Sequence, residues 1–409
     1  MRIAILSDPE NFHTQKWYTA LRNAGADPFV VSFGKEMQEP IRSIHIDPPL
    51  SFGKRFFYPS YLAGGKKLRA LLEKEKCDIL NPLNITPFGI WGARADFHPM
   101  VSCAFGADIL EYPPRGIESP WPENRSWNNT EGQLSGTRRI RGKLERNFFR
   151  KKVMEALKAS DLITGDNLVL TRAIHEWFGI EEKKIVLNRW GVEEELFSCT
   201  EEEKKELLPR FGISPEKKIV LAPRGAKAIY QADIILEAFA EFLKTGRSDV
   251  HFVLFSAGYE ISSGIKPLIE QLNRSGCFTF IPTALPRETM YKFWNLADVF
   301  ISAPVYDGYS ASLAEGRYIG AVPLVNKIPA NTELITHLEN GWIADPFTPE
   351  NISSSLVQIL DDLPNLKSRF SAANRNWIKE NSLIRNNAKI FVQNCESLLK
   401  DKKGKSITL

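Results

Sequence analysis

Short apolar runs alternate with amphipathic segments along most of the chain. Residues 3–6 (IAIL) are apolar, and the following segment places Trp17, Leu21 and Ala24 on one face of a helix, with Thr14 as a candidate N-cap. Uninterrupted apolar runs between amphipathic helices are typical of strands that are buried on both faces in a parallel sheet. The pattern therefore predicts an α/β fold in which helices cover both faces of the sheets.

The alternation is interrupted once and then starts again. Residues 111–137 are rich in Pro, Gly, Asn and Trp, which predicts a long loop, and a basic helix follows over residues 138–160. Strands and helices alternate again from about residue 195. Because 409 residues exceed one ordinary core of roughly 200, we expect two doubly wound domains and a helical tail. Their expected bounds are 1–190, 191–380 and 381–409.

Composition places the chain among ordinary globular proteins. Hydrophobic residues make up 43% and charged residues 25%, and the formal net charge is only +4, which gives no sign of a nucleic-acid partner. The start lacks the long apolar core of a signal peptide, and no run approaches the roughly 20 apolar residues of a membrane span. The five cysteines are scattered. These features favour a protein of the reducing cytoplasm.

Residues 304–325 (PVYDGYSASLAEGRYIGAVPLV) carry the clearest candidate chemistry. They read as the end of a strand, a loop, a helix and a further strand. Gly308 lets the backbone approach a ligand closely, and Ser310 or Ser312 can cap the helix. A helix N-terminus at the carboxyl end of a strand suits a phosphate, because its unpaired N–H groups and its dipole both favour an anion.

Two carboxylates flank this helix start. Asp307 precedes the helix, and Glu315 lies more than one turn inside it, between Ala314 and Gly316. We expect the small neighbours to leave Glu315 within reach of a ligand, where a carboxylate suits the vicinal hydroxyls of a sugar. The spacing of the two acids carries little by itself, since many acid pairs share it by chance. A capped surface helix with an exposed Glu is the alternative interpretation.

The stretch DGYSASLAEGRYIGAVPLVNKIPAN resembles the E-x7-E region of retaining glycosyltransferases of family 4, in the branch with a DGxSxSLxE-type donor motif. The resemblance implies the GT-B fold: two doubly wound, Rossmann-like domains that face a central cleft, and a C-terminal helix that crosses back to the first domain. It also implies that Glu315 holds the nucleotide ribose and that Asp307 contacts the donor hexose near the reacting carbon. The residues that would hold the diphosphate or the hexose are Gly308, Tyr309, Ser310, Ala311 and Ser312.

Two further stretches resemble the donor-binding half of this family. VLAPRGAKAIYQADIILEAF places Arg224 where the family has an arginine that grips the donor pyrophosphate. The family's lysine position falls on Tyr230, so the second cation is either Lys227 or a residue that the sequence does not identify. Such cations stabilise the charge that develops on a leaving diphosphate. FTFIPTAL resembles the segment whose backbone contacts the base, which points to Pro282 and Thr283.

The first domain resembles the family over a shorter motif. SDPENFHTQKW is similar to the first turn of the branch, which implies that His13, with Thr14 and Lys16 beside it, faces the acceptor. His13 would then hydrogen-bond a sugar hydroxyl or the acceptor. A histidine of the capping turn that holds no ligand is the alternative.

A second stretch of this domain, VSCAFGADIL, implies that Gly106 and Asp108 line the acceptor side. Asn81 and Asn84 stand where many relatives carry an H-x-H pair. Whether the first domain has a catalytic role therefore stays open.

The resemblance implies a retaining, metal-independent hexosyltransferase. The donor would be a nucleotide-diphosphate sugar, and the acceptor a glycan, a lipid-linked molecule or a small molecule, in cell-surface polysaccharide or glycolipid assembly. Asp307, Arg224 and His13 are the expected catalytic residues, with no metal and no cofactor beyond the substrate. The alternative function is a catalytically silent GT-B protein that binds a nucleotide sugar or a partner.

The basic helix raises the question of a membrane surface. A basic face with aromatic residues suits docking on anionic lipid or on a lipid-linked pyrophosphate, and a solvated basic face is the other interpretation. Docking would place this cytoplasmic protein at the inner face of the membrane. The residues expected to make the contact are Arg138, Arg139, Arg141, Lys151 and Lys152.

Overall fold

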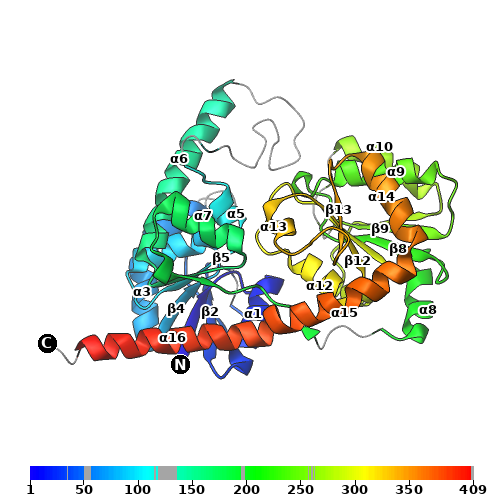
Figure 1. Ribbon diagram of the computed structural model, residues 1–409. Helices are drawn as coiled ribbons and strands as arrows, with labels where there is room; N and C mark the ends of the chain where they lie inside the picture. The colour runs from blue at the N-terminus through cyan, green and yellow to red at the C-terminus, as the bar shows by residue number, and fades with distance from the viewer. Residues whose placement is uncertain are drawn as a thin grey trace. The chain divides into compact units, whose positions relative to one another are not determined.

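The structure is a computed structural model, and it forms two compact units (Figure 1). It describes residues 1–34, 36–49, 57–114, 117, 136–194, 199–256, 258, 261 and 263–406, with the backbone alone for 57–58, 136–146 and 402–406. The first unit contains the described residues up to Trp190 together with those from Ile384 onward. The second unit contains the described residues from Gly191 to Leu383. Each unit is described below by itself.

The first unit is built on parallel strands in the order β3-β2-β1-β4, followed by β5-β6-β7. Isolated parallel bridges from Leu80 to Met100 and from Leu83 to Cys103 link β4 to β5. β1 is apolar and buried along most of its length, as expected for a strand covered on both faces. The strands are β1 (Arg2–Leu6), β2 (Asp27–Ser32), β3 (Ser43–His45), β4 (Ile79–Pro82), β5 (Val101–Ala104), β6 (Leu162–Gly165) and β7 (Ile185–Leu187).

Helices connect and cover these strands. The first begins earlier than the sequence pattern predicts, because the side chain of Asn11, rather than Thr14, accepts the capping hydrogen bond, from the N–H of His13. Thr14 lies inside the helix, where its hydroxyl bonds to that of Ser7 at 2.7 Å. The helices are α1 (Phe12–Asn23), α2 (Phe57–Ala63), α3 (Gly65–Lys74), α4 (Ile90–Ala95), α5 (Ala107–Leu110), α6 (Gly136–Ala159), α7 (Leu168–Phe178) and α16 (Ile384–Ser406).

The C-terminal segment contains two successive helices. α15 (Leu363–Asn381) packs in the second unit, and the chain then passes through Ser382 and Leu383 before α16 begins. α16 packs along α1 within the first unit, with Phe391 against Trp17 at a ring-centroid distance of 5.2 Å (Figure 1). The apolar face of the final helix is therefore buried against the first helix of the chain.

The second unit has the strand order β10-β9-β8-β11-β12-β13, with all neighbouring pairs parallel. This is a doubly wound order, and its direction reverses between β8 and β11. Such a reversal opens a crevice at the carboxyl ends of the two strands, where ligands of open α/β sheets bind. The strands are β8 (Lys218–Ala222), β9 (Val250–Phe255), β10 (Phe278–Ile281), β11 (Val299–Ser302), β12 (Val322–Asn326) and β13 (Trp342–Ala344).

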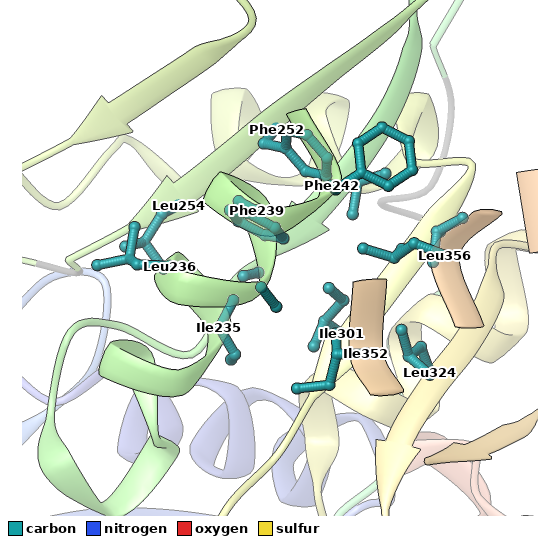
Figure 2. Close-up of a cluster of buried hydrophobic side chains, with 14 of the residues drawn as sticks. Ile235, Leu236, Phe239, Phe242, Phe252, Leu254, Ile301, Leu324, Ile352 and Leu356 are labelled. Carbon is teal, nitrogen blue, oxygen red and sulfur yellow. The ribbon is translucent and has the colours of Figure 1, made fainter. Parts of the chain in front are cut away.

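An aromatic and aliphatic core holds α9 and α14 on one face of this sheet. Phe239 of α9 stacks on Phe252 of β9 with centroids 4.1 Å apart, and Ile352 and Leu356 of α14 close the same cluster (Figure 2). A second cluster around Phe293 and neighbouring side chains covers the other face. The helices of this unit are α8 (Glu201–Arg210), α9 (Ala232–Leu243), α10 (Lys266–Asn273), α11 (Arg287–Leu296), α12 (Ala311–Ile319), α13 (Pro329–Thr332), α14 (Pro349–Asp361) and α15.

The prediction of two doubly wound α/β domains is confirmed. Parallel sheets with helices on their faces are present in both units. Most of the predicted loop over residues 111–137 lies outside the described residues. Within the described part of the chain, no helix combines the length and the apolar character needed to cross a membrane.

Candidate functional site

The crevice of the second unit brings together residues that are distant in sequence. Arg224 follows β8, and Asp307 lies in the loop after β11, so the reversal of strand order places both at the same end of the sheet. The two side chains form an ion pair, and each is only 15% exposed. Arg224 also donates from Nη1 to the Ser310 hydroxyl at 2.7 Å. The sequence predicted these residues for one site, and the structure brings them into contact.

The guanidinium of Arg224 is held on a second side by an aromatic ring. It lies over the ring of Tyr230, 4.5 Å from the centroid, and its Nη2 is 3.4 Å from the Tyr230 hydroxyl. Burial alone would lower the pKa of Arg224, but the Asp307 carboxylate and Tyr230 outweigh it and raise that pKa. Tyr230 thus contacts the arginine at the position where the resemblance led us to look for a lysine. No local sequence pattern indicates this ring contact, because it depends on the turn at Ala228–Tyr230.

Lys227 lies at the start of the same turn. It is half-buried, and burial lowers the pKa of its ammonium group. Its backbone carbonyl accepts from Tyr230 N–H at 2.9 Å, which fixes the turn that presents the Tyr230 ring to Arg224. Lys227 and Tyr230, whose ring contacts the Arg224 guanidinium, therefore belong to the same turn.

The start of α12 is capped as the sequence predicted, and Ser310 rather than Ser312 is the cap. Its hydroxyl accepts from Leu313 N–H at 3.3 Å while also accepting from Arg224. Ala311 and Ser312, at the first helical positions, are half-buried. The Ser310 hydroxyl therefore links the N-terminus of α12 to Arg224, which follows β8.

Two other residues of this loop are buried. Gly308 is buried in the backbone turn between the ion pair and the helix. Tyr309 is buried as well, and its hydroxyl hydrogen-bonds to that of Ser382. Tyr309 thus links the loop to the segment where the chain leaves the second unit, an arrangement that the sequence did not suggest.

Glu315 is buried rather than open. It is 5% exposed, and its two carboxylate oxygens accept from Trp294 Nε1 at 3.1 Å and from the Tyr291 hydroxyl at 3.5 Å. The small neighbours therefore do not leave the side chain exposed, since two donors from the aromatic residues of α11 cover and orient it. A Cβ on Gly316 would lie 2.7 Å from the ring of Phe300, so the glycine lets α12 pack closely on β11.

Tyr291 and Trp294 are functional-site residues that the sequence reasoning missed. They lie three positions apart on α11, which places both on the face toward Glu315. Burial and then the Glu315 charge raise the pKa of Tyr291, so its hydroxyl keeps its proton and donates. The only sequence signal was an aromatic pair at helical spacing, which usually indicates core packing.

Glu193 and Arg287 extend this network. They form an ion pair, and the Glu193 carboxylate lies 3.5 Å from the Tyr291 hydroxyl. The Arg287 guanidinium lies over the Tyr291 ring at 5.5 Å. One tyrosine therefore stands between two buried or half-buried carboxylates, Glu193 and Glu315.

Pro282 and Thr283 follow β10 at the same end of the sheet. Both are exposed, in contrast to Ile281, which is buried as the last residue of the strand. Both residues are therefore accessible at the carboxyl end of the strand, where the resemblance implied contacts to a nucleotide base.

Solved structures share this fold along their whole length. A glycosyltransferase from Rickettsia africae superposes with a TM-score of 0.72 at 15% identity, over 98% of each chain. The sucrose-phosphate synthase of Thermosynechococcus elongatus gives 0.74 at 13% identity, over 98% of this chain and 100% of that one. Anabaena HepE in complex with UDP-glucose gives 0.72 at 14% identity, over 97% and 100%. Similarity at these identities establishes the fold, which is GT-B.

Family models match both units. Residues 203–377 match the model described as glycosyl transferases group 1, and residues 2–121 match the one described as glycosyl transferase 4-like. The chain belongs to the GT-B glycosyltransferases. No curated protein matches it in sequence.

In the first unit of this GT-B protein, His13 lies at the start of α1. Its side chain is exposed, and its ring makes an edge contact with Trp190 at 5.7 Å. Trp190 is buried and also packs against Trp17 and Phe105, at 5.3 and 4.8 Å between ring centroids. His13 therefore stands at the border of an aromatic cluster. Lys16 and Thr14, which the sequence placed beside it on the acceptor side, are buried in α1.

Asp108 is saturated by backbone donors. Its Oδ2 accepts from Ile85 N–H at 2.7 Å, and its Oδ1 accepts from the N–H groups of Phe105 and Gly106 at 3.1 and 3.0 Å. Burial raises the pKa of this carboxyl to about 6, although the backbone donors act in the opposite direction. Gly106 adopts a φ of 117°, a conformation that favours glycine, and thereby presents its N–H to Asp108. Both residues organise a turn of the GT-B protein.

Asn81 lies in the core of the first unit. It is fully buried, accepts from Trp17 Nε1 at 3.0 Å and donates to the Val101 carbonyl at 2.7 Å. These bonds join α1, β4 and β5 inside the first unit. The side chain is thus part of the core of the GT-B protein.

The basic helix is described only in part. The side chains of Arg138, Arg139 and Arg141 lie outside the described residues. Lys151 is exposed, whereas Lys152 pairs with Glu155 at 2.8 Å. Among the side chains that the structure describes, His, Cys, Asp and Glu do not gather in groups of three or more that could hold a metal ion.

Proposed function

We propose that this GT-B protein is a retaining, metal-independent glycosyltransferase that moves a hexose from a nucleotide-diphosphate sugar. The observation that carries the proposal is the contact of Arg224 with Asp307 and Ser310 at the start of α12, in the crevice of the second unit. A diphosphate at this point would meet a guanidinium and the first N–H groups of a helix. Both favour an anion.

The ion pair suggests how the donor would enter. Diphosphate oxygens would replace the Asp307 carboxylate on the Arg224 N–H groups, since a guanidinium binds phosphate as readily as carboxylate. Asp307 would then be released toward the hexose, which follows the diphosphate in the donor. Asp307 would therefore become available to the sugar only when the diphosphate has displaced it from Arg224.

The chemical step needs stabilisation of the leaving group. The bond between the anomeric carbon and the diphosphate oxygen breaks with its electron pair leaving on the diphosphate, and the acceptor oxygen attacks from the same face. The acceptor proton passes to a diphosphate oxygen. Arg224 and the α12 N-terminus would stabilise the negative charge on the leaving diphosphate, which is the largest electrostatic demand of the step.

Glu315 would orient the nucleoside. Each carboxylate oxygen can accept a second hydrogen bond beyond the one from Trp294 or Tyr291. Because those two donors already fix the carboxylate, ribose hydroxyls would meet a pre-oriented acceptor pair. We propose a uridine diphosphate sugar as the first donor to test, because the HepE structures contain UDP and UDP-glucose.

The acceptor half is proposed on less direct grounds. His13 and the aromatic residues around Trp190 would contact a glycan, a lipid-linked or a small-molecule acceptor. Arg138, Arg139, Arg141 and Lys151 would favour an acceptor presented at an anionic membrane surface of the cytoplasm.

The deciding experiment begins with thermal stability in a panel of nucleotide-diphosphate sugars, without added metal and in the presence of a chelator. Stabilisation by one donor, followed by detection of transfer and NMR assignment of the product anomer, supports the proposal. Glu315→Ala should weaken donor binding, and Asp307→Ala should lower turnover more than binding. If no nucleotide sugar stabilises the protein, the proposal fails. Binding without transfer to any acceptor indicates a silent binding module instead.

A further inference from the structure

The loop that carries Asp307 is held at its entry by three successive residues. The Ala303 carbonyl accepts from Gln231 Nε2 at 3.0 Å, and Val305 N–H donates to the Ile229 carbonyl at 2.8 Å. Between them, the Pro304 carbonyl accepts from Asn326 Nδ2 at 2.7 Å. Asp307 therefore lies two residues beyond a backbone segment that is held by hydrogen bonds from two neighbouring elements.

Asn326 is itself oriented by a second asparagine. It is the last residue of β12, and Asn331 of the following short helix donates from Nδ2 to its Oδ1 at 2.8 Å and to its backbone carbonyl at 3.1 Å. A donor at Oδ1 leaves only one orientation of the amide, in which Nδ2 points to the Pro304 carbonyl. The two asparagines thus form a directed chain of hydrogen bonds that ends on the loop.

Burial makes this chain stiff. Asn326 is 5% exposed and Asn331 is 0% exposed, so water does not compete for these bonds. The Oδ1 of Asn331 is buried and has no hydrogen-bond partner among the described residues. Burying an unsatisfied amide oxygen is costly, whereas the Nδ2 group of the same side chain makes two hydrogen bonds to Asn326. That group holds Asn326.

We propose that Asn326, oriented by Asn331, is a positioning residue for Asp307. The inference rests on the proposed function, since Asp307 matters for turnover only if the protein transfers a sugar. Clamping the Pro304 carbonyl sets where the loop starts, and a displacement of about 1 Å at a reacting group can lower turnover about a hundredfold. The asparagines touch neither the diphosphate-binding cation nor the nucleoside-binding carboxylate, so donor affinity should change little.

The test uses Asn326→Asp, which keeps the shape and the acceptor for Asn331 but cannot donate to the Pro304 carbonyl. We expect a kcat at least about tenfold lower, with the donor KM within about threefold of the original value. Hydrogen exchange should rise in residues 304–310 and stay unchanged in the other loops of the second unit. Asn326→Asp combined with Asp307→Ala should lose no more turnover than Asp307→Ala alone, because coupled residues are not additive.

Asn374→Asp is the matched control. Asn374 is also buried in the second unit, and it donates to a backbone carbonyl, that of Asn340, at 2.8 Å. Its substitution removes the same kind of amide-to-carbonyl hydrogen bond away from the Asp307 loop, so kcat and the exchange of residues 304–310 should stay unchanged. Unchanged kcat, or unchanged exchange of residues 304–310, in Asn326→Asp overturns the positioning role. Absence of transfer by the unmodified protein overturns the proposed function instead, so the two failures are distinguishable.

Discussion

The two units reverse their strand order in the same way but place different chemistry at the reversal. In the first unit, the side-chain contacts just after β1 and within β4 join neutral groups: Ser7 bonds to Thr14, and Asn81 bonds to Trp17. In the second unit, the corresponding ends of β8 and β11 carry a cation and an anion in contact, Arg224 and Asp307.

The acids of the two units differ in the same way. Both oxygens of Asp108 accept from backbone N–H groups, and a ligand could not replace these donors without unfolding a turn. Asp307 is paired instead with one side chain, Arg224, to which a ligand anion can bind in its place. The comparison indicates that strand order alone does not make a binding site. The strand ends must also carry charged side chains whose present partners a ligand can replace.

The largest expected difference between the two units is at Arg224. We expect Arg224→Ala to lower kcat/KM about a thousandfold, because it removes the diphosphate-binding charge and leaves Asp307 buried without its cation. Arg247→Ala is the control, since Arg247 pairs with Asp249 and Asp361 just before β9, at the opposite end of the strands. Steady-state kinetics with the identified donor measure both. Equal losses in the two variants would contradict a specific role.

The stability of the second unit should depend on acid through His251. This residue of β9 is 2% exposed, and burial together with Lys217 lowers its pKa to about 4. Because the unfolded histidine binds a proton near pH 6.5 and the folded one resists it, stability should be lost as the pH falls from about 6.5 to about 4, by roughly 3 kcal/mol. Urea unfolding at both pH values measures this, and His251→Phe should remove that slope.

Asp108→Asn and Asp307→Asn test the contrast between the two acids directly. In Asp108→Asn, the new NH₂ group faces backbone N–H groups that have lost their acceptor. We therefore expect the free energy of unfolding to fall by about 2 kcal/mol. Asp307→Asn keeps an oxygen acceptor beside Arg224, whose guanidinium also contacts Ser310 and the Tyr230 ring, and it should change stability less while lowering turnover. Denaturant titrations and kinetics on both variants measure the two effects. The reverse pattern would show that Asp307 is the structural acid.

The smallest expected effect lies at Tyr230. Tyr230→Phe keeps the ring beneath Arg224 and removes only a 3.4 Å hydrogen bond, so donor affinity should fall by about threefold or less. Tyr230→Ala should cost about tenfold, because the guanidinium loses the face that orients it. Calorimetric titration with the donor nucleotide resolves the two. An equal loss in both variants would assign the effect to the hydroxyl.

The local sequence predicted what depends on neighbouring residues. The apolar runs of β8, β11 and β12 and a serine cap at the start of α12 follow from patterns within a few positions. The order of these elements predicted doubly wound α/β domains, and the resemblance of the donor-binding motif implied the GT-B fold. Arg224 and Asp307 were predicted for one site from two separate motifs, and their contact confirms that they lie together.

What escaped prediction depends on contacts between distant segments. Trp294 and Tyr291 bind Glu315 from another helix, so the buried state of that carboxylate could not be read from its small neighbours. The break between α15 and α16 at Ser382 likewise involves a distant segment, because Val192 N–H donates to the Ser382 carbonyl at 2.7 Å. In each case a partner more than about twenty positions away decided the outcome.

The ion pair at the end of β8 has a kinetic consequence. Since the charge of Arg224 is matched by Asp307, the crevice attracts a polyanion only weakly from a distance. Association would then depend little on ionic strength and would be limited by opening the pair, whereas discrimination among donors would appear in the dissociation rate. Stopped-flow measurement of the association rate at several salt concentrations tests this expectation, and a steep salt dependence of that rate would contradict it.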